Sequence, residues 1–290
     1  MDWLQQTLDE LEQPTGWGYR PGAPAATEPA ALAALALAGH GRAAAARRAG
    51  DWLLAQQTPD GSLGIFAANH APHWATSQAV LAWQAIDRQA FAQPTSRAID
   101  WMYTVAGTIS ERNPDLGHDT TLRGWPWVEG THSWLEPTSW CVLALKATDR
   151  RQHPRVREAV KLLIDRQLPG GGSNYGNTSV LGQVLCPHLE PSGLSLLALS
   201  GETDANGRIA RSLDYVVGAV NADVTSASLG YALLGLAAHD RLPPDYAPWL
   251  AKAAARSKQR DSLGPRLTLL ALAALGTKCP LITVTREVSS

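Results

Sequence analysis

One pattern recurs six times along this chain: a turn-rich loop, then a Thr or Ser, then a run of Leu and Ala. The clearest copies lie at Thr27, Thr138 and Ser192, and looser copies start near Thr76, Thr225 and Gly264. Each run is apolar on all sides, which is typical of a helix buried in a core. A repeat at intervals of tens of residues therefore predicts an array of stacked helical hairpins.

Six amphipathic segments alternate with these apolar runs. They cover residues 2–13, 41–57, 94–106, 154–167, 206–220 and 244–258. Their apolar residues recur three and four positions apart, which predicts helices with one face in water. We therefore predict an all-α fold, an (α/α)6 toroid with six inner helices inside six outer ones. A single domain is expected over residues 1–278, followed by an extended C-terminal tail over 279–290.

The loops that lead from an outer helix to an inner helix are long, whereas those in the other direction are short. The long loops cover residues 16–26, 58–73, 108–135 and 169–188. All of them open onto the end of the ring where the inner helices begin, here called the mouth. The positive ends of the inner-helix dipoles also point there. Because long loops in compact domains are usually functional, we expect the ligand site at the mouth.

The composition disfavours several classes of function. A net charge of −1 argues against nucleic acid or an anionic membrane as the main partner. No apolar run reaches the ~18 residues that a transmembrane segment needs. The acidic, amphipathic start of the chain is unlike a secretory signal. The three cysteines show no paired spacing, so we expect reduced thiols and a cytoplasmic location. The oligomeric state stays open.

Two short motifs resemble a known repeat. Gln57–Gly61 and Gln167–Gly171 each begin with Gln and end with Gly four residues later. This spacing is similar to the repeat motif of the squalene cyclase and prenyltransferase superfamily, in which a Trp follows two residues after the Gly. Leu63 and Ser173 stand in place of that Trp here. The resemblance covers nearly the whole chain and implies the toroid fold.

The resemblance implies two kinds of enzyme, namely class II terpene cyclases and zinc-dependent protein prenyltransferases. The cyclases protonate an alkene with an Asp-x-Asp-Asp-Thr motif at the start of an inner helix. Aligning its Thr with Thr138 places the proton-donating Asp at Glu136, while the two flanking acids are absent. The zinc pattern is not matched, because Ser139 stands where an Asp would precede Cys141. We therefore expect Glu136 to be the acid, and neither metal nor cofactor.

Aromatic and polar residues crowd the stretch around Glu136. A carboxyl group in an aromatic mouth would have a raised pKa and could act as a general acid, with His132 and Glu129 as its partners. The faces of Trp rings stabilise cations, so the mouth is expected to be an apolar, aromatic pocket for a small-molecule substrate. The predicted substrate-binding residues are Trp74, Trp125, Trp127, Trp134, Trp140, Tyr19, Asn174, Tyr175 and Glu190.

Simpler structural roles stay open for several of these residues. Glu28, Glu136 and Glu190 each precede a proline at a helix start, where a Glu favours the helix dipole. The Trp residues of loop 108–135 could serve only to pin that loop to the ring.

Metal binding is a further alternative. His70 and His73 form a His-x-x-His pair, and Cys186 lies close to His188. Neither pair has a further ligand at a recognised tetrahedral spacing.

Three functions are compatible with these features. The leading one is a terpene cyclase-like enzyme that acts on an isoprenoid or similar apolar substrate by acid-initiated carbocation chemistry. The second is a non-catalytic toroid that binds a lipid, an isoprenoid or a protein partner. The third is a carbohydrate-active toroid, which would need two carboxylates ~5–5.5 or ~6.5–9.5 Å apart.

Overall fold

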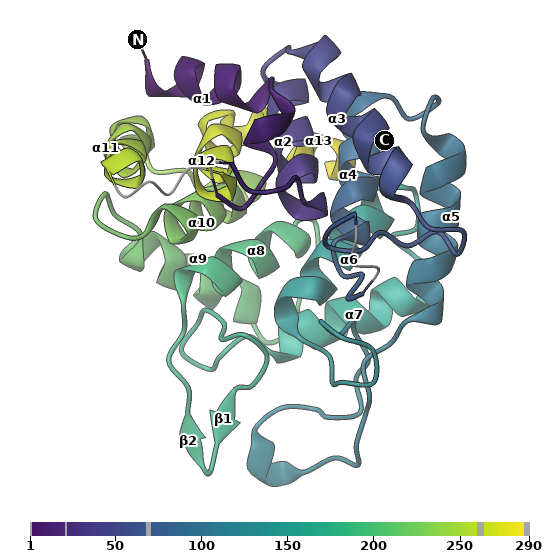
Figure 1. Cartoon of the computed structure of the whole chain (residues 1–290). Coiled ribbons are helices and arrows are strands. Elements are labelled where there is room, and N and C mark those ends of the chain that lie inside the picture. The colour runs from purple at the N-terminus through teal and green to yellow at the C-terminus, as the bar shows by residue number, and fades with distance from the viewer. Residues whose placement is uncertain (1, 21, 68–70, 260–263, 287–290) are drawn as a thin grey trace.

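The computed structural model describes residues 2–20, 22–67, 71–259 and 264–286. The inner helices are α2 (Thr27–Gly39), α4 (Thr76–Ile86), α6 (Leu135–Ala147), α8 (Leu189–Ala198), α10 (Ser226–Ala238) and α12 (Pro265–Ala274). The outer helices are α1 (Trp3–Leu11), α3 (Ala43–Gln56), α5 (Ala92–Thr104), α7 (Pro154–Asp165), α9 (Arg208–Ala219) and α11 (Tyr246–Gln259). Each inner helix packs against the next, and α12 packs against α2, which closes the ring (Figure 1). The predicted all-α toroid is confirmed.

The burial of the helices follows their sequence patterns. In α2 every residue from Pro29 to Leu37 is buried, as the run of Leu and Ala predicts. In α7 the buried residues include Val156, Ala159 and Leu163, which lie on one helix face. The inner helices are apolar but short. None of the helices in the described ranges has the length and hydrophobicity that crossing a membrane requires.

Short elements lie between the helices. They are the 3-10 helices η1 (Pro14–Gly16), η2 (Pro114–Leu116) and η3 (Gly276–Lys278), and the strands β1 (Ser179–Val180) and β2 (Gln183–Val184). η2 and the two strands lie in the two longest loops. The two strands pair antiparallel, with Ser179 opposite Val184 and Val180 opposite Gln183. β1 contacts η2, so the loop after α5 and the loop after α7 lie side by side and project away from the ring in Figure 1.

The expectation of an extended tail over 279–290 is wrong where the structure describes it. Pro280–Arg286 form helix α13, which packs against α2, α4 and α6. Leu281 and Ile282 are fully buried. The run of Ile, Thr and Val favours strand by propensity, but burial of these side chains among the inner helices outweighs that preference. Residues 287–290 of the expected tail lie outside the described residues.

Glycines allow α8 and α10 to pack closely. A Cβ atom added to Gly193 would lie 2.3 Å from the carbonyl oxygen of Tyr231, and one added to Gly235 would lie 2.4 Å from the carbonyl oxygen of Gly193. Both contacts are to backbone, which cannot rotate away. The two helices therefore approach to a distance that only glycine permits at these positions.

Replacing Gly193 by Ala is expected to destabilise the protein by about 1–3 kcal/mol or more, because the added methyl group overpacks against backbone. Thermal unfolding followed by circular dichroism would measure the change. Gly218→Ala is the matched control, since a Cβ atom there meets nothing within 4 Å. That change in α9 should be neutral or stabilising by about 0.5–1 kcal/mol. Equal melting temperatures for the two variants would contradict the close packing.

Candidate active site at the mouth of the ring

Three glutamates converge at the mouth. Glu28, Glu136 and Glu190 are each the second residue of an inner helix, α2, α6 and α8 respectively, and each is followed by a proline. All three side chains are half-buried. Glu136 is close enough to Glu28 and Glu190 for both to raise its pKa, and Glu190 also raises the pKa of Glu28. Equivalent positions in different hairpins thus point their carboxyl groups toward one place.

Burial shifts the pKa of each of these carboxyl groups upward. The pKa of Glu136 is raised to about 8, first by desolvation and then by Glu28 and Glu190. Burial also raises the pKa of Glu28, although the Tyr19 hydroxyl donates a hydrogen bond to it at 2.8 Å. The pKa of Glu190 is raised by burial as well. Glu136 is therefore protonated at neutral pH.

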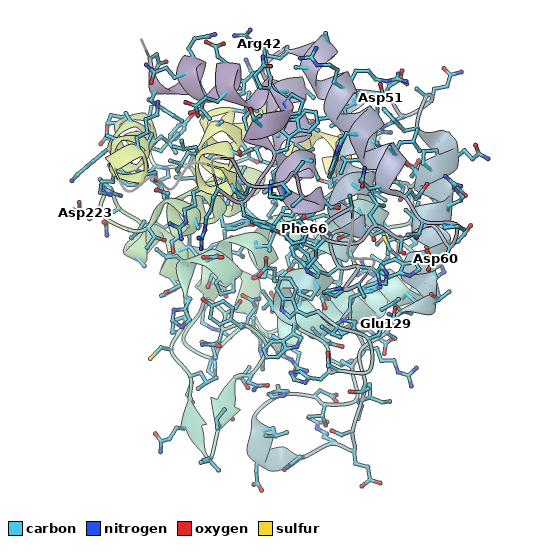
Figure 2. All side chains as sticks on the ribbon, viewed as in Figure 1. Arg42, Asp51, Asp60, Phe66, Glu129 and Asp223 are labelled. Atoms are coloured by element: carbon cyan, nitrogen blue, oxygen red, sulfur yellow. The ribbon has the colours of Figure 1, made fainter. Side chains whose placement is uncertain are left out.

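Tyrosines surround the carboxyl groups. Tyr231 of α10 is 3% exposed, and its ring packs edge-on against Trp140 at 6.2 Å. Burial raises the pKa of Tyr19, Tyr175 and Tyr231, and neighbouring glutamates raise each of them further. All three phenols are therefore neutral hydrogen-bonding groups. Tyr19 also packs edge-on against Phe66, which lies near the centre of the view in Figure 2.

Two buried polar groups at the mouth have no hydrogen-bond partner. Both amide atoms of Gln78 and the indole nitrogen of Trp140 are unpaired, and both residues are 0% exposed. Gln78 lies next to Glu28 and lowers the pKa of that carboxyl group, and Trp140 does the same for Glu136. Neither contact has the geometry of a full hydrogen bond. Unpaired buried polar groups are costly, so they favour a ligand that supplies a polar atom here.

The predicted tryptophans do not all lie at the glutamates. Trp74 and Trp127 pack edge-on at 4.7 Å and, with Trp125 and Glu129, line a side pocket of about 120 Å³ between the mouth loops, α5 and α6. The Trp125 indole donates to the carbonyl oxygen of Met102 at 2.8 Å, so it has a structural role between neighbouring elements. The sequence-predicted aromatic residues are thus divided between the mouth and this side pocket.

The two predicted partners of Glu136 are exposed. The His132 ring lies 4.4 Å from the Trp134 ring, and it lines a separate pocket of about 300 Å³ with Arg166. Glu129 lies on the side pocket. Glu136 lines neither of these two pockets. The structure therefore does not bring His132 and Glu129 to the acid.

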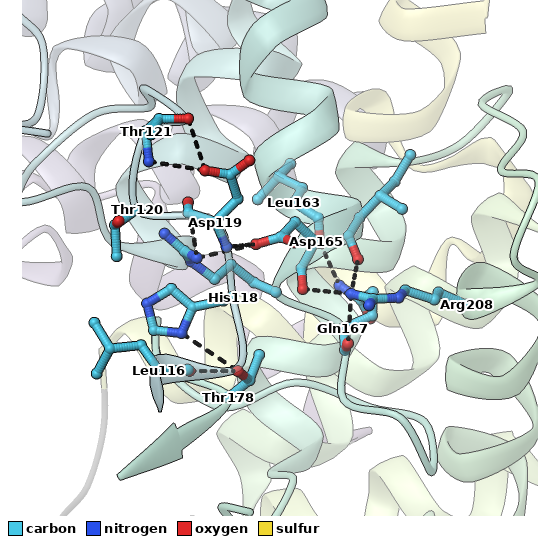
Figure 3. Close-up of polar contacts among 12 residues, drawn as sticks. Leu116, His118, Asp119, Thr120, Thr121, Leu163, Asp165, Gln167, Thr178 and Arg208 are labelled. Atoms are coloured by element: carbon cyan, nitrogen blue, oxygen red, sulfur yellow. Dashed lines mark hydrogen bonds and ion pairs between the residues drawn. The ribbon is translucent and has the colours of Figure 1, made fainter. Parts of the chain in front are cut away.

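Hydrogen bonds hold the two longest loops in place (Figure 3). The Asp119 backbone N–H donates to Asp165 at 2.9 Å, which ties loop 108–135 to the end of α7. His118 contacts the Thr178 hydroxyl at 3.3 Å, which ties the same loop to its neighbour. Asn174 donates to the carbonyl oxygen of Cys186 at 2.8 Å, so it braces the loop that carries Tyr175. Asn174 is therefore in a loop-supporting position.

The candidate metal ligands are dispersed. His70 lies outside the described residues, and His73 packs against Trp101 at 5.5 Å. Cys186 is exposed, and the His188 ring lies 5.4 Å from the Tyr175 ring. Within the described ranges no group of three His, Cys, Asp or Glu residues could hold a metal ion.

A larger groove of about 460 Å³ lies along the seam between α1 and α12. None of the predicted site residues lines it. Volume alone therefore does not identify the site, and the carboxyl cluster at the mouth is the better candidate.

Sequence reasoning missed two residues at the mouth, Gln78 and Tyr231. Each lies in the first two turns of an apolar inner helix, behind small Ser or Thr residues. The only signal was that a fully buried run contains a group that needs a hydrogen-bond partner.

Three solved structures illustrate the likeness in fold, and two of these three are terpene cyclases. The type II terpene cyclase MstE from Scytonema, a variant in complex with geranylgeranyl dihydroxybenzoate, matches over 96% of this chain and 98% of its own at 12% identity, with a TM-score of 0.60. ent-Copalyl diphosphate synthase from Streptomyces platensis matches over 91% of this chain and 52% of its own at 19% identity and a TM-score of 0.53. A protein from Actinoplanes matches over 99% of both chains at 16% identity and a TM-score of 0.52.

The chain therefore has a terpene cyclase-like toroid fold, which confirms the resemblance predicted from its motifs. At these identities the likeness shows the fold alone. No family model matches the sequence, and no curated protein matches it.

Proposed function

We propose that this protein is a terpene cyclase-like enzyme that binds an isoprenoid or similar apolar substrate at the mouth and starts the reaction by donating a proton from Glu136. The observation that carries the proposal is the convergence of Glu136 with Glu28 and Glu190 in a desolvated mouth, which raises the pKa of Glu136 to about 8 and favours its protonated form at neutral pH. A positioned carboxyl group that keeps its proton can act as a general acid. The fold shared with terpene cyclases supports the same assignment.

In the proposed reaction the Glu136 proton passes to one carbon of a substrate double bond. A C–H bond forms from the π electrons, and a carbocation remains on the neighbouring carbon. A second double bond attacks this cation and closes a ring. Loss of a proton to a carboxylate or to water ends the sequence, so the product is an isomer of the substrate.

A raised pKa also makes Glu136 a weaker acid, so the mouth must stabilise the carboxylate as the proton leaves. The buried, unpaired indole N–H of Trp140 lowers the pKa of Glu136 and suits this role. The rings of Trp140 and Tyr231 can stabilise a nearby carbocation by about 0.5–2 kcal/mol each. We retain Tyr19, Tyr175 and Glu190 as residues that contact the substrate.

The proposal is tested by incubating the protein in D2O with linear isoprenoid alcohols and with phenols that carry an isoprenoid chain. The length of the chain increases along each series. Acid-initiated cyclisation yields an isomer that carries one deuteron on carbon, which mass spectrometry detects. Substrate recovered without deuterium across the whole series would overturn the proposal.

A non-catalytic toroid is the second candidate. The observation that favours it is the absence of flanking acids, because Trp134, Leu135 and Pro137 surround Glu136 in sequence. Extraction of the purified protein would then release an apolar ligand that the protein binds and returns unchanged.

A further inference from the structure

We propose that the mouth selects ligands with a positively charged head group, an amine or quaternary ammonium on an apolar chain, over ligands that carry a phosphate. The inference rests on the proposed function only in that both place the ligand at the mouth. It concerns which head group is bound, whether or not the ligand is then converted.

The geometry of the polar groups supports this selection. Three carboxyl groups approach one another from α2, α6 and α8, and the Tyr19 hydroxyl donates to one of them at 2.8 Å. The unpaired amide of Gln78 and the unpaired indole of Trp140 lie against the same cluster, and both are 0% exposed. The Gln78 amide and the Trp140 indole therefore remain able to form hydrogen bonds with a ligand at the cluster.

The charges around the cluster are predominantly acidic. Arg266 of α12 and His188 act on Glu190, and both side chains are exposed. Among the described residues, no basic side chain contributes to the pKa of Glu28 or Glu136. The other titratable groups that face the cluster are the neutral phenols of Tyr19, Tyr175 and Tyr231. A phosphate would meet one exposed arginine and three carboxyl groups, whereas a cation would meet three carboxyl groups whose ionised form it stabilises.

Binding of a cation should release protons. All three glutamates have raised pKa values in the free protein, and Glu136, with a pKa of about 8, holds a proton near neutral pH that a nearby positive charge would displace. Affinity for a cation therefore increases as the pH rises through about 8. Affinity for a phosphate should fall over the same range, and affinity for a neutral alcohol should change little.

The test uses three ligands with the same chain, decyltrimethylammonium, 1-decanol and decyl phosphate, each below the concentration at which it aggregates or separates from water. Titration calorimetry with the full chain, at about pH 6.5 and about pH 8.5 in buffers of different ionisation heat, gives affinity and proton release together. We expect the ammonium ligand to bind at least ~10-fold more tightly than the alcohol at the higher pH, and to release protons.

Two variants locate the effect. Glu190→Gln should reduce the advantage of the ammonium ligand over the alcohol roughly tenfold. Asp51→Asn is the control, because Asp51 is an exposed carboxylate of α3 paired with Arg47 at 2.8 Å, at the outer edge of the molecule (Figure 2). It should change neither affinity.

Tighter binding of decyl phosphate, cation binding without proton release, or equal effects of the two variants would overturn the inference. These outcomes leave the deuterium test of the proposed function intact. Conversely, a failed deuterium test with selective ammonium binding would overturn catalysis and support the head-group selection.

Discussion

Replacing Glu136 by Gln is expected to abolish formation of the deuterated product while leaving the ring folded. Glutamine has almost the same volume but has no acidic proton to donate. Removal of a general acid typically costs 10²–10⁴-fold in rate, so turnover should fall by roughly that amount. The product assay in D2O measures the loss, and circular dichroism checks the fold. Asp51→Asn should behave as the unmodified protein, and retained turnover in Glu136→Gln would exclude Glu136 as the acid.

The same variant should also change how stability depends on pH. Glu136 has a pKa of about 8 when folded, against an ordinary value of 4.5. A group with a raised folded pKa stabilises the fold fully below its unfolded pKa, and this stability is lost as pH rises through the folded value. The unmodified protein should therefore lose stability between about pH 5 and pH 8, and Glu136→Gln should lose less. Glu28 and Glu190, whose pKa values are also raised, contribute to the remaining slope.

Replacing Glu202 by Gln is expected to cost about 3–5 kcal/mol of unfolding free energy, because it leaves a buried positive charge without its counter-ion. The Nζ atom of Lys146 lies 2.8 Å from Glu202, and the two side chains are 1% and 5% exposed. Burial lowers the pKa of Lys146 to about 8, and the lysine in turn lowers the pKa of Glu202. The pair thus stays ionised at neutral pH.

Two comparisons separate the pair from its surroundings. In Lys146→Met, Glu202 keeps its ion pairs with Arg151 and Arg157 at 3.3 and 2.7 Å, so this variant should lose less stability than Glu202→Gln. The double variant should recover part of the loss, because neither charge is then left alone. Urea unfolding measures all three. If the unfolding free energy of Glu202→Gln lies within ~1 kcal/mol of that of the original protein, the pair is not important for stability.

The sequence predicted most of the fold because burial on all sides leaves a distinct pattern. Inner helices such as α2 and α6 consist mainly of apolar residues such as Leu and Ala, with few polar residues. Only a helix that is buried on all sides needs such a sequence. Helix α13 could not be predicted in the same way. Its Ile, Thr and Val residues favour strand locally, and only the inner helices around it make a helix the better solution.

The candidate site was predictable only in part. Glu136 and Glu190 could be placed at the mouth because position in the repeat determines where a helix start lies, and Tyr19 because it lies in a long loop that opens there. The division of the tryptophans could not be predicted, because Trp74 and Trp127 lie in loops whose paths have no periodicity. Their contacts depend on which neighbouring loop they meet.

The closed seam between α2 and α12 has a consequence for how the chain folds. His40 contacts the carbonyl oxygen of Ala271 at 2.9 Å, a pair separated by 231 positions in sequence. In an open array a terminal hairpin can detach at the cost of one interface, whereas each hairpin of a ring has two. Partial unfolding is therefore suppressed, and the transition should be all-or-none. Until the last hairpin has folded, the chain forms an open arc with an exposed apolar helix face at each end. Two such arcs can pack against each other instead of each closing into its own ring.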